Sequence, residues 1–284
     1  MFEKRRSELL SWEAEKKKLN FICSTLKDHG ILIKPGSRLF RYQRIVDALD
    51  NSRPNQLPKG FKTKHFHQIA IEIHQLSFVV EELCNSIQFD EWSKKFSFLV
   101  SGNELPEDDT NHFARNYQFE LFVAGIFQKA RLKPLCEEPD IVIEKDEEKF
   151  GVAVKRPNSF KQLDKNLRKG RDQIINPEVP GILFLDMSLI SNPNNYICIA
   201  DDIESVTDLL IKYLDLFSEA NINPIRNIID NKMVFGIIFH LNALCDLNNR
   251  LGHCSRIAIK NLCSQNSPHF HALEYIANAL KKIY

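Results

Sequence analysis

Residues Glu138 to Pro157 read EPDIVIEKDEEKFGVAVKRP, and they contain the clearest structural signal in the chain. Two short runs rich in β-branched residues flank a charged turn at Lys145 to Glu148, which is the pattern of a β-hairpin. We expect the turn to be centred between Asp146 and Glu147. The cross-strand pairs are then Ile143 with Phe150, Ile141 with Val152 and Asp140 with Ala153.

This register brings an acid and a base to one face of the hairpin. Side chains alternate along a strand, so Ala153 and Lys155 share a face with Asp140, whereas Val152 and Val154 point to the other side. Cβ atoms of a directly opposed pair lie about 4.5–5.5 Å apart, and those of a diagonal pair about 7–8 Å apart. An aspartate and a lysine at these positions can therefore reach the same bound ion or phosphate.

The hairpin resembles the motif of the PD-(D/E)XK nucleases. Pro139-Asp140 matches the first half of that motif and Ala153-Val154-Lys155 the second, with Ala153 where the family normally has Asp or Glu. Arg156-Pro157 also looks like the Lys-Arg-Pro that often follows the motif strand. The resemblance covers roughly residues 112 to 190, where the expected order of helix, two antiparallel strands, helix and strand is that of the family's core.

The resemblance implies a metal-dependent chemistry. In the family, the aspartate, a second carboxylate and a main-chain carbonyl hold Mg²⁺, which lowers the pKa of a water and neutralises the phosphate. Carried over by position, Asp140 is a metal ligand, the Val154 carbonyl is a second ligand and Lys155 is the catalytic cation. Mg²⁺ is the expected ion, with Mn²⁺ as a substitute. Because Ala153 cannot coordinate a metal, the second carboxylate has to come from another element.

Glu120 is the residue that we expect to supply this carboxylate. It is the only polar residue in the run from Phe119 to Phe127, and a carboxylate in apolar surroundings must be neutralised, paired or bound to a cation. An ion pair with Arg115 is the alternative that the residues alone leave open. Glu120 matches the metal-binding or metal-orienting glutamate that the family often has before the hairpin, and we expect its helix to pack on the hairpin's active face. Asp164, on the helix after the hairpin, is a second candidate.

The helix expected from Ser159 to Ile174 combines an apolar stripe with a basic side. The stripe recurs at helical spacing and comprises Phe160, Leu163, Leu167, Gly170 and Ile174, with Gly170 allowing a close approach to the sheet. From Lys155 to Arg171 there are seven basic residues against one acid, a local net charge of +6. Such a segment in an otherwise neutral chain is the electrostatic footprint of a polyphosphate ligand.

The segment that follows the motif strand is expected both to bind nucleic acid and to add a residue to the catalytic site. The residues expected to bind nucleic acid are Arg156, Lys161, Lys165, Arg168 and Lys169. Gln173 lies on the other flank of the helix, where many members of the family have a glutamine that points at the site, and the resemblance adds it to the catalytic residues. A solvated basic face is the alternative explanation of the charges alone.

The rest of the chain predicts an α/β fold of the restriction-endonuclease type, preceded by an all-α domain. Four helices are expected over residues 2–28, 38–49, 64–87 and 90–100. The polar, acidic segment 101–111 then separates a helical N-terminal domain (1–105) from a nuclease-like domain (106–284). In the second domain we expect further helices over 112–131, 203–218 and 268–283. Strands over 181–186, 233–239 and 256–260 extend the hairpin into a mixed sheet covered on both sides.

Composition limits the other classes of function. Lys and Arg number 38 and Asp and Glu 37, so any basic surface is local. Seven scattered cysteines without a C-x-x-C pair indicate reduced thiols. Neither a signal peptide nor a membrane-spanning run is present in the sequence, so we expect a cytoplasmic protein that does not bind membranes.

Several other groups could in principle bind ligands, but their spacing favours ordinary structural roles. The histidines at 65, 67 and 74 lack a third ligand at zinc spacing, and so does the set of Cys245, His253, Cys254, Cys263, His269 and His271. The run Lys16-Lys17-Lys18 is interpreted as a solvated helix face. Asp186, at the end of a strand, is not assigned as a ligand.

We therefore expect a metal-dependent nuclease that acts on DNA rather than RNA, in restriction, defence, repair or recombination. The competing hypothesis is that Ala153 marks a nuclease fold that has lost cleavage and binds nucleic acid or protein. A third hypothesis is an interaction protein, whose N-terminal helices bind a protein partner or a second copy of the chain.

Overall fold

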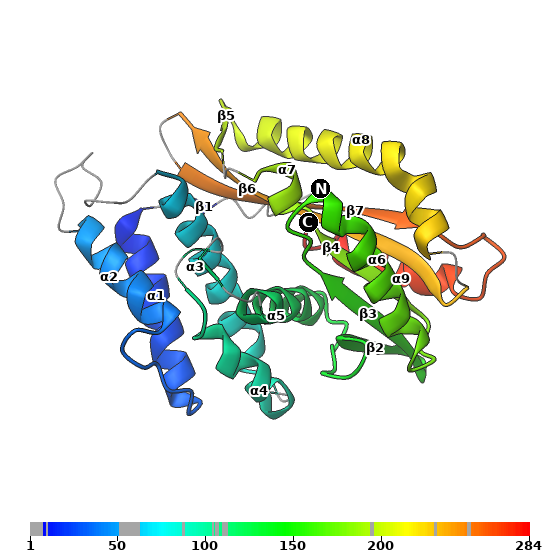
Figure 1. Ribbon diagram of the computed structural model, residues 1–284, viewed down its shortest axis with the longest axis horizontal. Helices are drawn as coiled ribbons and strands as arrows, with labels where there is room; N and C mark the ends of the chain where they lie inside the picture. Colours follow the sequence, from blue (N-terminus) through cyan, green and yellow to red (C-terminus); the bar gives the residue numbers. More distant parts are fainter. Residues whose placement is uncertain are drawn as a thin grey trace.

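The computed structural model describes residues 8–9, 11–50, 63–86, 89–103, 105, 108–109, 113–193, 196–229, 232–248 and 251–284. Within these residues the chain is a mixed α/β protein, in which helices cover a curled sheet of seven strands (Figure 1). No helix in the described part of the chain has both the length and the apolar character that crossing a bilayer requires.

The N-terminal part of the chain forms five helices on one side of the molecule. They are α1 (Trp12–Asp28), α2 (Arg38–Asp50), α3 (Thr63–Leu83), α4 (Phe89–Leu99) and α5 (Phe113–Lys129). Their positions agree with the predicted helices, because each buries the apolar side chains that recur at helical spacing. Two predicted ends, Ile87 and His112, lie outside the described residues.

The start of the first predicted helix is wrong. Glu8–Leu9 form strand β1, which pairs with β7 (Leu251–Asn261), and α1 begins only at Trp12. Ser11 ends the extended segment, since its hydroxyl accepts a hydrogen bond from the Ala14 N–H at 3.1 Å and so caps the helix. Apolar spacing alone gave no sign that the edge of β7 offers a backbone partner to these residues.

The hairpin forms in the predicted register. β2 (Ile141–Lys145) pairs antiparallel with β3 (Glu148–Lys155), with Ile141 opposite Val152 and Ile143 opposite Phe150. Asp146 and Glu147 both have positive φ, 50° and 69°, as the two central residues of a type I′ hairpin turn require. The ladder starts at Ile141, so Asp140 lies one residue outside it.

The hairpin forms one end of the sheet, whose order is β1-β7-β6-β4-β3-β2. β4 (Gly181–Asp186) runs parallel to β3 and to β6 (Val234–Leu247), and β6 pairs antiparallel with β7. The short β5 (Cys198–Ala200) pairs with the far end of β6. The remaining helices are α6 (Phe160–Ile175), α7 (Ser188–Ser191), α8 (Ile203–Ile229) and α9 (Phe270–Leu280).

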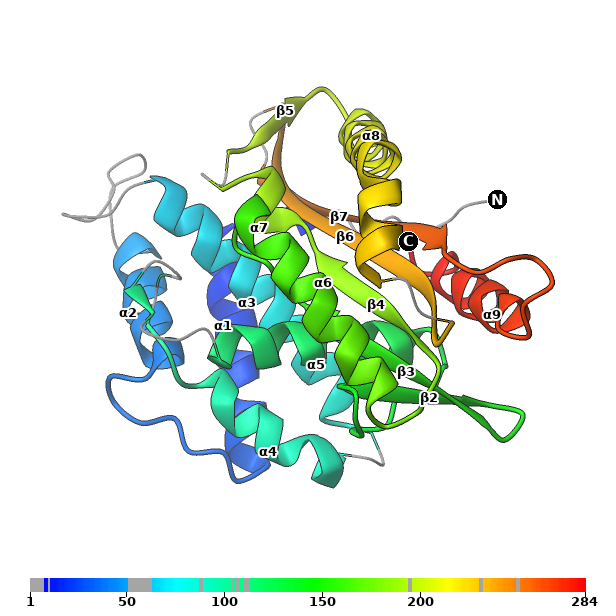
Figure 2. The ribbon, with the colours of Figure 1, turned by 45° about the vertical axis from the view of Figure 1, so that its right-hand side comes forward.

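Different helices cover the two faces of the sheet. Figure 2 shows α5 and α8 on opposite sides of the strands. The face under α5 and α9 includes Val152, Val154 and Phe184, and the face under α6 and α8 includes Ala153, Leu183 and Leu185. The alternation expected within β3 is therefore confirmed, and it assigns α5 and α6 to opposite faces.

Three elements are longer than predicted, and two besides β1 were not predicted. β6 continues past Phe239 because the polar side chains of His240 and Asn242, which interrupt its apolar run, are buried in the fold. β7 extends the predicted strand 256–260 at both ends. α8 continues eleven residues beyond Ser218, through Pro224. α7 and β5 have too few residues for a periodic signal.

The hydrophobic core is continuous across the predicted domain boundary. One buried cluster runs from α1 to α4, through α5, to the face of the sheet that contains Val152 and Phe184. α5, which was assigned to the second domain, packs against α3 and α4. The division of the chain into the domains 1–105 and 106–284 stays a prediction.

Candidate active site

The carboxylate of Asp140 is the centre of the candidate site. Its Oδ2 accepts hydrogen bonds from the Val154 main-chain N–H at 2.7 Å and from Lys155 Nζ at 3.1 Å. Its Oδ1 accepts a hydrogen bond from Gln173 Nε2 at 3.1 Å. The three predicted residues Asp140, Lys155 and Gln173 thus meet in one cluster, although they come from the start of β2, the end of β3 and the last turn of α6.

Two glycines allow these elements to approach closely. A Cβ atom on Gly151 would lie 2.7 Å from Pro139, so a glycine in β3 leaves room for the residue before Asp140. A Cβ atom on Gly170 would overlap Leu183 and would lie 3.4 Å from Lys155 Cγ. The close approach of α6 predicted from Gly170 is confirmed, and it brings Gln173, one turn further on, to Asp140.

Lys155 is largely buried, with 12% of its side chain exposed. Besides Asp140, its ammonium group contacts the Val154 carbonyl oxygen at 2.7 Å. These two acceptors, the Asp140 carboxylate and the Val154 carbonyl, are the groups that bind the metal in the family pattern. Since an ammonium group has three N–H donors, one donor is left over for another oxygen.

Glu120 reaches the same cluster from the other side of the sheet. Burial raises the pKa of its carboxyl above the ordinary value, and the charge of Asp140 raises it further, while Lys95 and Lys155 act in the opposite direction. The expectation that its helix packs on the active face is wrong, because α5 covers the Val152 face. Arg115 is not its partner either: that guanidinium pairs with Glu72, at 2.7 Å, and with Asp109.

Lys95 on α4 is the residue of this cluster that the sequence did not reveal. Its Nζ lies 3.0 Å from Glu120 Oε2 and donates to the Asp140 main-chain carbonyl at 3.1 Å. It also lies 5.5 Å from the centre of the Trp92 ring. Burial lowers the pKa of Lys95, but the Glu120 carboxylate outweighs this and keeps the pKa above its ordinary value. Its spacing from the buried residues Trp92 and Leu99 puts Lys95 next to the buried side of α4, but this spacing does not identify Glu120 or Asp140 as its partners.

Ala153 lies on the same face of the sheet as Lys155, as the alternation along β3 predicts, but it contributes no polar group to the cluster. Its side chain is fully buried and packs in the apolar layer beneath α6 that includes Leu163, Leu167 and Leu183. Asp164, the alternative acid on this helix, is exposed. The carboxylates near the cluster are therefore those of Asp140 and Glu120.

The donor chemistry of the cluster suits a hard divalent cation. Asp140 and Glu120 offer carboxylate oxygens and Val154 a carbonyl oxygen, and Mg²⁺ commonly binds through one or two carboxylates together with water and substrate phosphate. Among the described residues, no group of three or more His, Cys, Asp or Glu side chains is arranged to hold a metal. An ion at this site would thus depend on two side chains, and both already contact an ammonium group.

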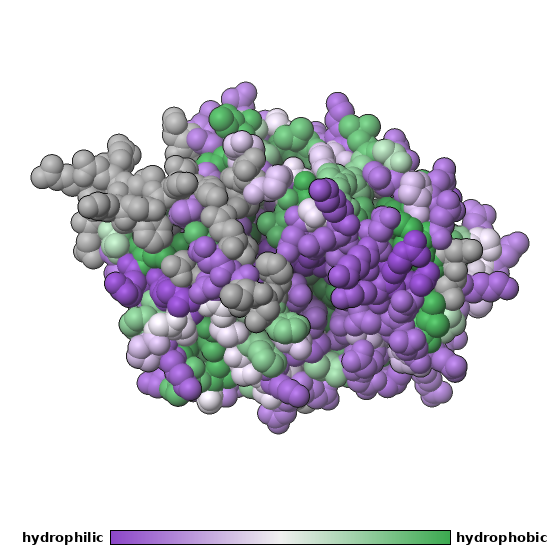
Figure 3. Space-filling model, viewed as in Figure 1, coloured by the Kyte–Doolittle hydropathy of each residue, from purple (hydrophilic) through white to green (hydrophobic). Residues whose placement is uncertain are grey.

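The basic side of α6 faces solvent next to the cluster. Lys161, Lys165 and Lys169 are spaced four residues apart and form one row along the helix. The three lysines and the neighbouring Arg168 are exposed, and Figure 3 shows hydrophilic side chains gathered over this part of the molecule. Gln173, which contacts Asp140, is one turn beyond Lys169 and lies on the flank of the helix next to the row.

One residue of the predicted apolar stripe lies at the surface. The side chain of Phe160 is 56% exposed and contacts Phe217 on α8, with 6.0 Å between the ring centres. The other four positions of the stripe, Leu163, Leu167, Gly170 and Ile174, are buried as predicted.

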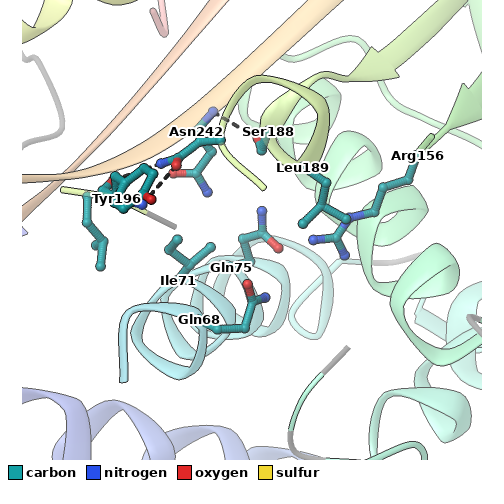
Figure 4. Close-up of a pocket in the computed structure, with 10 residues that line it drawn as sticks. Gln68, Ile71, Gln75, Arg156, Ser188, Leu189, Tyr196 and Asn242 are labelled. Atoms are coloured by element: carbon teal, nitrogen blue, oxygen red, sulfur yellow. Dashed lines mark hydrogen bonds between the residues drawn. The ribbon is translucent and has the colours of Figure 1, made fainter. Parts of the chain in front are cut away.

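Arg156 does not belong to this exposed surface, which corrects its assignment as a nucleic-acid-binding residue. Only 5% of its side chain is exposed, and its Nε lies 3.1 Å from Asp186 Oδ2. It alternates with Lys155 along β3 and so points to the other face, toward Gln75 on α3 (Figure 4). The pocket that it lines there with Asn242 has a volume of about 10 Å³, which is close to the space of a single water.

Asp186 has a structural role at the end of β4. It accepts hydrogen bonds from the Ser188 N–H at 3.0 Å and the Ser188 hydroxyl at 2.6 Å, and it lies 3.6 Å from His240 Nδ1. Burial alone would raise its pKa, but His240 and Arg156 outweigh this and lower the pKa to about 2. This supports leaving Asp186 out of the ligand set, because its charge is balanced by a buried arginine.

The fold brings together one residue from each of the two other groups that were considered as metal sites. His74 packs against His253 with 3.9 Å between ring centres. All seven cysteines are free of disulfide bonds.

Comparisons with protein-family models, with curated proteins and with solved structures give no match for this chain. The resemblance to the PD-(D/E)XK nucleases therefore rests on the motif residues and on the contacts described above.

Proposed function

We propose that the chain is a metal-dependent nuclease that hydrolyses phosphodiester bonds, with DNA as its substrate. One observation carries the proposal: the Asp140 carboxylate contacts Lys155, Gln173 and the Val154 N–H at once, with Glu120 beside it. Four residues chosen from sequence alone, on four different elements, lie together.

Each residue has a distinct part in the proposed chemistry. Asp140, Glu120 and the Val154 carbonyl are the groups that would hold Mg²⁺ or Mn²⁺, which when bound supplies a water of lowered pKa and neutralises phosphate charge. Lys155 donates to an oxygen of the phosphate or of the attacking water. Gln173 fixes the Asp140 carboxylate by donating to its Oδ1 and to the Pro139 carbonyl, at 3.1 and 3.0 Å.

The row of lysines on α6 supports a long polyanion as substrate. Lys161, Lys165 and Lys169 have no ion-pair partner among the described residues, and Lys169 lies one turn from Gln173 on the same helix. Cations arranged along one line match the repeating charge of a nucleic-acid backbone better than the compact charge of a small phosphate. We expect these lysines to bind without regard to base sequence, because lysine contacts to phosphate carry no sequence information.

The proposal is tested by incubating the protein with supercoiled plasmid and with single-stranded DNA, in Mg²⁺ and in Mn²⁺. We expect cleavage that falls by about 100-fold or more in Asp140→Asn and in Lys155→Met, because each removes a group that acts on the reacting phosphate. Lys149→Met is the matched control: Lys149 is on the same strand and pairs with Glu137 at 2.8 Å, but it is exposed and outside the cluster. Cleavage that survives both site variants would contradict the proposal.

Binding without cleavage is the second candidate function. It is favoured by the charges of the cluster, in which two carboxylates, Asp140 and Glu120, face two ammonium groups, Lys95 and Lys155. Such a cluster has no excess negative charge with which to attract a divalent ion. Salt-sensitive DNA binding by the wild-type protein, with no cleavage in either metal, would support this function instead.

A further inference from the structure

Lys95 links the helical half of the chain to the candidate site. It is on α4, 45 residues before Asp140 in the sequence, yet its ammonium group contacts both Glu120 Oε2 and the Asp140 main-chain oxygen. The family motif does not include a lysine from this direction. The ammonium group also lies 5.5 Å from the centre of the Trp92 ring, and 18% of the side chain is exposed.

The position of Lys95 matters because its contacts are with the groups that would hold a metal. Lys95 contacts the Glu120 carboxylate, and Lys155 contacts the Asp140 carboxylate and the Val154 carbonyl. Every group in the implied ligand set therefore has an ammonium group within 3.1 Å. A divalent ion that used the same oxygens would lie a few ångströms from both positive charges, and at such distances the repulsion is substantial even with solvent screening.

The two lysines differ in what they can do for the proposed reaction. Lys155 has a role in the family pattern, as the cation that acts on the water or the phosphate. Lys95 has none, and it neutralises the carboxylate that has to replace the acid missing at Ala153. We propose that Lys95 is an internal competitor of the metal: it holds Glu120 in the metal-free protein and has to leave Glu120 before a divalent ion binds.

This inference rests on the proposed function, and it adds a form of regulation to it. Because Lys95 is anchored on α4, any partner or substrate that moves α4 or draws the Lys95 ammonium away changes the affinity of the site for metal. The helical half would then control metal loading, in addition to packing against the sheet.

The test measures the binding of Mn²⁺ alone, at pH 8.5, by the loss of the electron paramagnetic resonance signal of the free ion. We expect Lys95→Met to bind Mn²⁺ about tenfold more tightly than the wild-type protein, since one repelling charge is removed. The added substitution Glu120→Gln should abolish this gain. Lys95→Arg, which keeps the charge, should bind as weakly as the wild type.

Lys129→Met is the matched control. Lys129 is also a partly buried lysine on a helix, with its Nζ 2.8 Å from Glu82 and 5.6 Å from the centre of the Phe78 ring. It should leave Mn²⁺ affinity unchanged while losing a similar ion pair. If Lys95→Met does not fold, as judged by its circular dichroism and thermal transition, Lys95→Gln replaces it, because an amide can still donate to Glu120 without a charge.

The outcomes separate the inference from the function. Wild-type binding that Asp140→Asn abolishes, together with unchanged or weaker binding in Lys95→Met, would overturn the role of Lys95 and leave the nuclease proposal in place. No Mn²⁺ binding in any variant would overturn both the inference and the metal-dependent chemistry.

Discussion

At the scale of single residues, the apolar environment of Ala153 accounts for an alanine at the position where the PD-(D/E)XK motif has an acid. The side chain packs with Leu163, Leu167 and Leu183, in a layer where all four are buried. An ionised carboxylate in that layer would be desolvated without a hydrogen-bonding partner, which is costly. In the proposed site the second carboxylate is therefore that of Glu120, whose helix covers the opposite face of the sheet.

We predict that Ala153→Glu destabilises the protein by about 2–4 kcal/mol, the range for burying an unpaired polar group. Urea unfolding monitored by fluorescence measures the loss. Ala153→Met is the control, because it adds a side chain of similar length without a charge. If Ala153→Glu proved as stable as Ala153→Met and bound Mn²⁺ more tightly than the wild type, a carboxylate at position 153 would have to reach the site instead of being held in the apolar layer.

The part of the site that strand and helix periodicity determine could be predicted from the sequence. The turn fixes the register of the hairpin, and the register brings Lys155 to Asp140. Gln173 was expected at the site from the resemblance to the family, and helical spacing placed it on one flank of its helix. Lys95 could not be found in this way, because its place depends on how α4 packs against α5. Arg156 was assigned to the surface because no local signal distinguishes a solvated arginine from one that pairs with a buried aspartate.

At the scale of elements, α6 joins the core, the site and the charged surface. Its buried stripe packs under α8 and on β3 and β4, Gln173 contacts Asp140, and its lysines are exposed. A rigid helix thus holds the basic row at a fixed distance from the Asp140 cluster.

We predict that replacing Lys161, Lys165 and Lys169 together by Gln weakens DNA binding and lowers its salt dependence. The slope of log K against log salt concentration should fall by about 2 to 3, since each phosphate contact contributes about 0.9. Fluorescence anisotropy with a labelled duplex at several salt concentrations measures this slope. The same triple substitution at Lys27, Lys281 and Lys282, which are also exposed, should leave it unchanged; an equal fall in both variants would contradict a specific role for the row.

The elements that the sequence predicted least well are those whose polar residues are buried. β6 includes His240, whose Nε2 lies 2.8 Å from the Ser255 hydroxyl on β7, so a polar residue is accommodated in the sheet interior. α8 passes through a polar stretch and Pro224 because Ile225, Ile228 and Ile229 beyond it pack in the core. In both cases tertiary contacts outweigh the local pattern.

At the scale of the whole molecule, buried charges hold the helical half together. Glu72 on α3 pairs with Arg38 on α2 at 3.2 Å and with Arg115 on α5 at 2.7 Å, and all three are buried. Burial alone would raise the pKa of Glu72, but the arginines and Tyr42 outweigh this and lower the pKa to about 2. This network spans the predicted domain boundary, as the hydrophobic core does.

We predict that the Glu72 network makes the protein sensitive to acid. A carboxyl whose pKa is lower in the folded state stabilises the fold above its unfolded pKa, about 4.5, and this contribution is lost as the pH falls toward about 2. The shift corresponds to on the order of 3 kcal/mol. Glu72→Gln should be strongly destabilised at pH 7, with a difference from the wild type that narrows between pH 5 and pH 2 in urea unfolding.

The control for this prediction is Glu13→Gln, which removes an exposed pair with Lys17 at 2.7 Å. Exposed pairs contribute little to stability, so the unfolding free energy should change by less than about 1 kcal/mol at every pH. A Glu72→Gln difference that is independent of pH would contradict the proposed charge network.

Whether the Asp140 cluster is a metal-dependent active site is decided most simply by the anomalous scattering of Mn²⁺ soaked into crystals of the protein. We predict one peak about 2 Å from an Asp140 carboxylate oxygen, with Lys95 moved away from Glu120. The proposal would be contradicted if crystals soaked at a Mn²⁺ concentration that supports DNA cleavage showed no peak at Asp140 and unchanged contacts of Lys95 and Lys155.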